Sequence, residues 1–105
     1  MESLNFTLPG QSVRQIDKPA VLAGVVSSGN LEVLIESAEL AGACQVQIRT
    51  SAQGFAEIWS AVLEDFASRY DLANLRISVN DGGATPAVVS LRLDQAMENF
   101  IGVAP

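Results

Sequence analysis

Apolar and polar residues alternate along several short stretches of the chain, which is the pattern of β-strands with one buried face. The alternation is clearest where Leu31, Val33 and Ile35 would share one side of a strand and the residues between them the other. We predict five strand stretches, at residues 4–8, 20–26, 31–36, 43–50 and 75–79. The first is followed directly by a Pro-Gly pair, and we expect it at an edge of the sheet.

Residues 27–30 separate two of these strands and have the composition of a turn. They read Ser-Ser-Gly-Asn, in which glycine supplies a positive φ and serine and asparagine can bond to nearby backbone. We therefore predict a β-hairpin that presents the hydroxyls of Ser27 and Ser28 at its exposed tip. On local chemistry alone, an exposed turn serine with no further role is the commoner case. A hydroxyl with no base beside it suits modification by another enzyme better than catalysis by the chain itself.

Two further stretches have the period of an amphipathic helix. The first has one apolar stripe, formed by Phe55, Ile58, Trp59, Val62, Leu63, Phe66 and Tyr70. We expect Trp59 in the core and Ser51 as an upstream cap. The second begins at Thr85-Pro86, a capping residue followed by proline at the first helical position, and ends at Gly102. Its predicted buried face consists of Val89, Leu93, Ala96, Met97 and Phe100.

The order of elements is strand, hairpin, strand, helix, strand, helix. Short links between consecutive strands favour antiparallel pairing, with both helices packed on one face. We predict an α+β fold: a two-layer domain with a mostly antiparallel sheet of about four strands and two helices on one face. The 105 residues are expected to form a single domain, in which residues 1–19 supply the edge strand and an exposed connector.

The chain is acidic, with a formal net charge of −6 and a pI of about 4.3. This balance argues against nucleic acid, which requires a basic surface, and against anionic membranes. It suits docking on basic patches of larger partners. No stretch resembles a secretory signal or a membrane span, so we expect a cytoplasmic location.

The chain has no histidine and one cysteine. It therefore lacks the commonest general base, cannot form an internal disulfide and is a poor candidate for a zinc site. Cys44 alternates with apolar residues and is expected to be a buried structural thiol. We interpret the acidic residues Glu57, Glu64 and Asp65 as a solvated or partner-docking helix face. An autonomous enzyme is thus disfavoured.

Residues 81–86 place two glycines before a helix, an arrangement that resembles a phosphate cradle. The spacing and lysine of a nucleotide-binding loop are missing, and Asp81 would repel an anion. A simple turn with a helix cap is the favoured interpretation, with a supporting contact to a phosphodiester as the alternative.

Two segments resemble one known family. Residues 23–33 (AGVVSSGNLEV) resemble the acyl carrier (delta) subunit of malonate decarboxylase, whose signature is a serine, a glycine and usually an acid before an alternating strand. Residues 79–96 (VNDGGATPAVVSLRLDQA) resemble its second half, where an Asp/Gly turn leads into an arginine-containing helix. The acyl carrier subunit of citrate lyase is related, but its later turn lacks the TPAVV continuation.

The resemblance implies that Ser28 carries a covalent phosphoribosyl-dephospho-CoA arm through a phosphodiester. Gly29 and Asn30 complete the motif, and Asn30 stands where the family usually has aspartate. The adjacent Ser27 is the alternative attachment residue. In the family, the thiol of the arm carries acetyl and malonyl thioesters, malonate displaces acetate, and other subunits perform the decarboxylation.

The partners that the resemblance implies are the acyl (carrier) transferase and decarboxylase subunits, the arm-attaching transferase and a malonyl transferase. The chain itself would be a non-catalytic carrier. Two alternatives remain: the acyl carrier subunit of citrate lyase, and an acidic interaction module that carries no arm.

Overall fold

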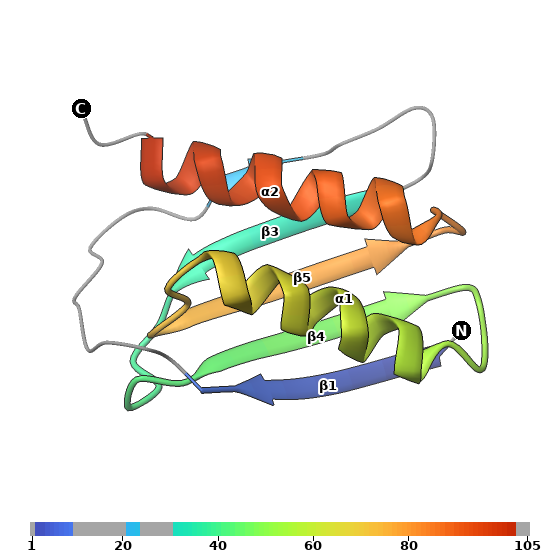
Figure 1. Ribbon diagram of the computed structural model, residues 1–105, viewed down its shortest axis with the longest axis horizontal. Coiled ribbons are helices and arrows are strands. Elements are labelled where there is room, and N and C mark those ends of the chain that lie inside the picture. Colours follow the sequence, from blue (N-terminus) through green and yellow to red (C-terminus); the bar gives the residue numbers. More distant parts are fainter. Residues whose placement is uncertain (1, 10–20, 24–30, 103–105) are drawn as a thin grey trace.

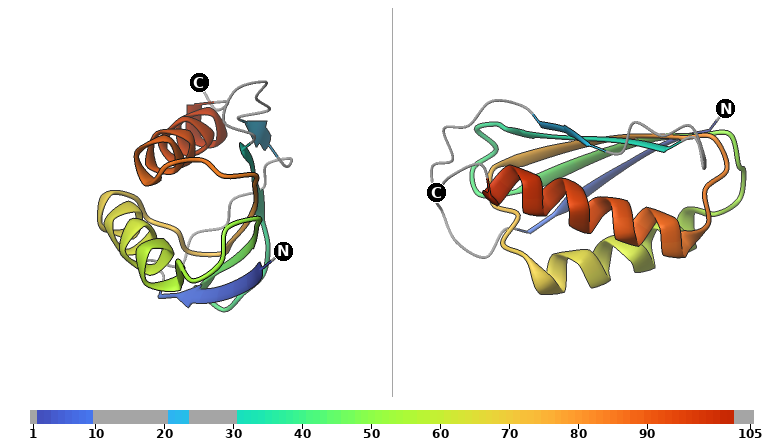
Figure 2. Two further views of the ribbon diagram at one scale, coloured as in Figure 1. Left: turned by 90° about the vertical axis from the view of Figure 1, so that its right-hand side faces the viewer. Right: turned by 90° about the horizontal axis from the view of Figure 1, so that it is seen from above.

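The computed structural model describes residues 2–9, 21–23 and 31–102, which form a sheet with two helices on one face (Figures 1 and 2). The elements are β1 (Glu2–Leu8), β2 (Val21–Ala23), β3 (Leu31–Ser37), β4 (Cys44–Thr50), α1 (Ala56–Arg69), β5 (Leu75–Asp81) and α2 (Pro86–Gly102). The predicted two-layer α+β fold is confirmed.

The described strands form a mixed five-stranded sheet in the order β1-β4-β5-β3-β2. The sheet has one strand more than the four or so expected, because all five predicted strand stretches join it; β2, described over Val21–Ala23, lies within the predicted stretch 20–26. Pairing is mostly antiparallel as predicted, but β4 and β5 run parallel. The expectation that consecutive strands pair is wrong for β3 and β4, because β5 lies between them. Helix α1 joins β4 to β5 as a crossover connection, which a parallel pair requires.

The two arms of the predicted hairpin are present. β2 pairs antiparallel with β3, with Val21 opposite Ile35 and Ala23 opposite Val33. The turn between them, including Ser27, Ser28, Gly29 and Asn30, lies outside the described residues. β1 is an edge strand paired with β4, as expected, and the connector predicted after it also lies outside the described part of the chain.

Apolar side chains from the sheet and both helices form one core. The buried strand residues are Leu31, Val33, Ile35, Cys44, Val46, Ile48, Leu75, Ile77 and Val79. From α2 the core receives Val89, Leu93, Ala96, Met97 and Phe100, which is the face that the sequence predicts. Each large apolar side chain buried here contributes about 1.5–3 kcal/mol relative to exposure.

The first turn of α1 departs from the predicted stripe. Trp59, Leu63 and Phe66 are buried, but Phe55 and Ile58 are 43% and 42% exposed. Phe55 is the N-cap residue and makes no side-chain capping bond, so the prediction of Ser51 as the cap is wrong. The helix starts too far along the chain for Ser51 to cap it.

Asn74 ties together two links at the end of the sheet where β5 begins. It adopts a left-handed conformation (φ 59°), which asparagine tolerates better than most residues. Its Oδ1 accepts hydrogen bonds from the N–H groups of Leu40 (3.1 Å) and Gly42 (2.9 Å). The β3–β4 link and the α1–β5 link are thereby held side by side.

Candidate functional site

The candidate site lies at the end of the sheet where β5 ends, opposite to Asn74. The two segments that resemble the known family, around Ser28 and around Asp81, meet the sheet at this end. Leu31, the first residue of β3, pairs with Asp81, the last of β5, and Asp81 also pairs with Thr50, the last of β4. Both helices begin at this end (Figure 1). We call it the Asp81 end. Because Leu31 directly follows Asn30, the predicted site residues Ser28, Gly29 and Asn30 join the described chain here.

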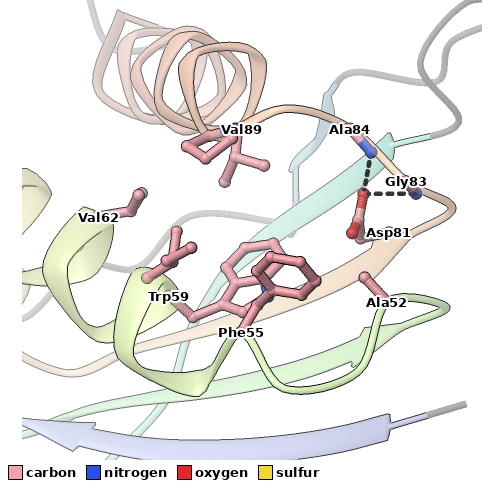
Figure 3. A pocket seen from close by; sticks show the side chains of 10 residues that line it. Ala52, Phe55, Trp59, Val62, Asp81, Gly83, Ala84 and Val89 are labelled. Carbon is pink, nitrogen blue, oxygen red and sulfur yellow. Dashed lines mark hydrogen bonds between the residues drawn. The ribbon is translucent and has the colours of Figure 1, made fainter.

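Asp81 organises the turn into α2. Its carboxylate is buried, with the residue only 5% exposed. One oxygen accepts the hydroxyl of Thr50 at 2.8 Å, and the other accepts the N–H groups of Gly83 (3.1 Å) and Ala84 (2.7 Å; Figure 3). Because these N–H groups are already paired, they do not form a cradle for an external phosphate. The favoured interpretation of a simple turn is confirmed.

The turn ends in the predicted helix cap. The hydroxyl of Thr85 accepts the N–H of Val88 at 3.3 Å, and Pro86 is the first residue of α2. A capping hydroxyl satisfies one of the backbone N–H groups that a helix start leaves unpaired.

A cavity of about 300 Å³ opens between the start of α1 and the start of α2. Its α1 wall is formed by Phe55, Ile58, Trp59 and Val62, and Figure 3 shows Phe55 and Trp59 close together beside it. Ala84, Pro86 and Val89 contribute the α2 wall. Among the lining residues that the structure describes, Asp81 alone is charged, and both of its oxygens are engaged in the hydrogen bonds described above.

Arg92 on α2 has a buried nitrogen without a partner. Its Nε is inaccessible to solvent and forms no hydrogen bond. Asp94 faces α1, where it binds Arg69, so Arg92, two residues earlier on the helix, projects from the opposite flank. Since α2 also packs on β3 and β2, that flank is the one toward the hairpin strands. Leaving a charged donor buried and unpaired is costly, which makes Arg92 a candidate anion contact.

Among the described residues, the other candidate side chains are a buried thiol and a set of exposed carboxylates. Cys44 is fully buried as predicted, and burial raises the pKa of its thiol to about 12. Glu57, Glu64 and Asp65 are exposed on α1. Within the described ranges no group of three or more His, Cys, Asp or Glu side chains could hold a metal ion. Neither described helix is long and apolar enough to cross a membrane.

The cavity and Arg92 are the site features that sequence reasoning misses. The cavity has a weak signal, because Phe55 and Ile58 precede the well-packed part of the α1 stripe. Arg92 interrupts an apolar run in α2, but nothing in that pattern tells a buried nitrogen from a solvated one.

A family model described as the malonate decarboxylase delta subunit (MdcD) matches residues 18–100. The chain belongs to the malonate decarboxylase delta subunit family. The matched region includes the hairpin segment, the Asp81 end and almost all of α2. The resemblance seen in the two sequence motifs is thus confirmed across most of the chain.

Known members of this delta subunit family align with this chain over nearly its whole length. A malonate decarboxylase acyl carrier protein from Stenotrophomonas maltophilia is 53% identical over 105 residues, which cover 100% of this chain and 99% of the relative. One from Burkholderia cepacia is 61% identical over 97 residues, covering 91% and 87%. A chain in the crystal structure of a Pseudomonas malonate decarboxylase hetero-tetramer in complex with malonate superposes with a TM-score of 0.82 at 38% identity, covering 95% of this chain and 99% of that one.

Proposed function

We propose that the protein is the acyl carrier subunit of a malonate decarboxylase. It carries acetyl and malonyl groups as thioesters while other subunits convert malonate to acetate and CO2. The observation that carries this proposal is the near full-length similarity to proteins named malonate decarboxylase acyl carrier protein. The chemistry of the chain agrees, since it has no histidine and its one cysteine is buried.

The acyl groups are held on a phosphoribosyl-dephospho-CoA arm, joined to Ser28 by a phosphodiester. The bound arm supplies the thiol that the chain lacks. Support for Ser28 comes from its place before Gly29 and Asn30 in the family motif, between two strands that pair as hairpin arms. A phosphate-bearing arm also fits the described residues, because Arg92 offers an unpaired buried donor on the flank of α2 toward those strands.

The described residues have two tasks in this function. The β2–β3 pair and the Asp81 network hold the two ends of the attachment segment and the adjacent turn in place. The core keeps the thiol of Cys44 protonated and out of solvent, so that it cannot take acyl groups from the arm by thiol exchange.

The partners are the acyl (carrier) transferase and decarboxylase subunits, the transferase that attaches the arm, and a malonyl transferase. The structural relative comes from a malonate decarboxylase hetero-tetramer, which supports assembly with other subunits. The net charge of −6 suits docking on basic surfaces of these proteins. A cytoplasmic location and a single-domain organisation are part of the same proposal.

Intact-mass spectrometry tests the attachment. Protein co-expressed with the arm-building and arm-attaching enzymes should gain the mass of one arm, and Ser28→Ala should abolish the gain with an unchanged circular dichroism spectrum. Ser27→Ala is the matched control and should still be modified. If Ser27→Ala alone prevents modification, the neighbouring hydroxyl is the site.

The same experiment separates the carrier from the unmodified interaction module. The module predicts an unmodified mass in the native complex and full decarboxylase activity with Ser28→Ala. Either result would contradict the carrier function.

A further inference from the structure

We propose that the cavity between the starts of α1 and α2 binds the acetyl thioester at the tip of the arm and excludes the malonyl thioester. This inference rests on the proposed carrier function. It assigns the carrier a ligand site of its own, to which ten described residues contribute, that distinguishes its two cargoes.

The attachment residue lies within reach of the cavity. Leu31 pairs directly with Asp81, which lines the cavity, and paired Cα atoms on neighbouring antiparallel strands are about 5 Å apart. Ser28 precedes Leu31 by three residues, which span at most about 11 Å. The Cα of Ser28 is therefore within about 16 Å of that of Asp81. An arm containing phosphoribosyl, nucleotide and pantetheine units reaches farther than this.

The size and lining of the cavity favour the acyl end of the arm over its nucleotide end. A volume of about 300 Å³ is at the lower limit of small-molecule sites. The base and phosphates of a nucleotide need hydrogen-bond partners, but the oxygens of Asp81 are already paired and the other side chains of the lining are apolar. A neutral acetyl thioester has no donor and a single carbonyl acceptor, and its methyl group would cover apolar surface on the half-exposed Phe55 and Ile58.

Charge excludes the malonyl group. Its free carboxylate would enter an apolar cavity beside the carboxylate of Asp81, and none of the described residues of the lining is basic. The positive ends of the helix dipoles do not compensate, because Asp81 already binds the turn before α2 and Glu57 lies in the first turn of α1. The acetyl form of the carrier is thus shielded from water, whereas the malonyl form stays outside for a partner subunit.

The single tryptophan of the chain makes the cavity directly observable, because Trp59 lines it. The full-length unmodified protein is titrated with S-acetyl-N-acetylcysteamine and, separately, with S-malonyl-N-acetylcysteamine while Trp59 emission is recorded. We expect a saturable change with the acetyl probe and none with the malonyl probe.

Two substitutions test the location. Ile58→Glu places a carboxylate at the mouth of the cavity and should weaken acetyl-probe binding at least about tenfold, which corresponds to about 1.4 kcal/mol. Phe55→Glu, at a second half-exposed position, should do the same. Leu91→Glu is the matched control, since Leu91 is 56% exposed on α2 and is not part of the lining. It should leave probe binding unchanged.

The arm-loaded protein provides a second readout. A carbon-13-labelled acetyl group on the arm should show nuclear Overhauser contacts to the Trp59 indole, and its thioester should hydrolyse faster in Ile58→Glu than in Leu91→Glu. No response to the acetyl probe, an equal response to both probes, or an unaltered response in Ile58→Glu would overturn the inference. A dimer that Ile58→Glu dissociates, with no acetyl response, would instead assign the surface to a second copy.

Failure of the carrier function itself gives a different result. A protein that never acquires the arm would show no mass gain, yet the free probes would still report whether the cavity distinguishes the two thioesters.

Discussion

At the scale of single residues, Asp81 does more than end a strand. Its three hydrogen bonds join the last residue of β4 to the turn that starts α2. The same side chain forms part of the cavity wall. One buried carboxylate thus determines both the position of α2 and the charge that a ligand at this end encounters.

Asp81→Ala should lower the free energy of unfolding by about 2–4 kcal/mol, because it leaves the Thr50 hydroxyl and two backbone N–H groups without their acceptor. Urea unfolding followed by circular dichroism measures the loss. Asn80→Ala, at the exposed neighbouring position of β5, is the control. A loss as small as that of the control would mean that Asp81 is not needed to hold the turn.

The buried thiol of Cys44 should make the fold less stable at alkaline pH. Its pKa is about 12 in the folded protein, against 9.0 for an unburied thiol. Below pH 9 both states keep the proton and Cys44 adds no pH dependence; above pH 9 the unfolded state binds fewer protons, so the free energy of unfolding falls as pH rises. Urea unfolding between pH 8 and about 11 measures this slope.

Cys44→Ala should make that alkaline slope shallower without removing it. Burial also raises the pKa of the Tyr70 hydroxyl, and this shift acts in the same direction. An identical slope in Cys44→Ala and the parent protein would show that the thiol is not shielded.

At the scale of elements, one arginine connects the two helices. The guanidinium of Arg69 in α1 lies 2.6 Å from a carboxylate oxygen of Asp94 in α2. It also lies 3.1 Å from a carboxylate oxygen of Asp65, which is one turn earlier in α1. The hydrogen bond to Asp94 raises the pKa of Arg69. Arg69 and Asp65 are exposed and Asp94 is partly buried, so we expect this cluster to add little to the stability of the fold.

Arg69→Gln should lower the urea midpoint slightly at low salt, and the difference from the parent protein should shrink at high salt, because exposed ion pairs are screened. Arg49→Gln, on the exposed side of β4, is the charge-matched control. A difference that persists at high salt would indicate that packing of the Arg69 side chain, rather than its charge, joins the helices.

The helices and strands themselves were predictable because their signals are local. Alternation and helical period place every described element and, apart from the first turn of α1, its buried face, including the inward side of Cys44 and the α2 face from Val89 to Phe100. Pairing depends on contacts between distant segments, and this is where the prediction fails. No local pattern shows that β5 enters between β3 and β4, and the apolar residues at the start of α1 give only a weak signal of the cavity beside them.

At the scale of the whole molecule, the two ends of the sheet differ in character. At one end, Asn74 joins the β3–β4 link to the α1–β5 link by hydrogen bonds. The Asp81 end contains the start of β3, the end of β5, the starts of both helices and the cavity. The motif around Ser28 was recognisable from the sequence alone, but the place where the chain after it enters the sheet was not. Leu31 pairs with Asp81, a residue of the cavity lining, and only the assembled sheet reveals this register.

The central place of β5 also determines when the protein can begin to fold during synthesis. The ribosome produces β1, β2, β3 and β4 before β5, yet both β3 and β4 pair with β5 over their whole length. Until that late strand emerges, the nascent chain can form two separate strand pairs, β1 with β4 and β2 with β3, but has no strand to join them. A chain stopped just before residue 75 would thus keep at most these two pairs and no five-stranded sheet, although it would contain four of the five described strands.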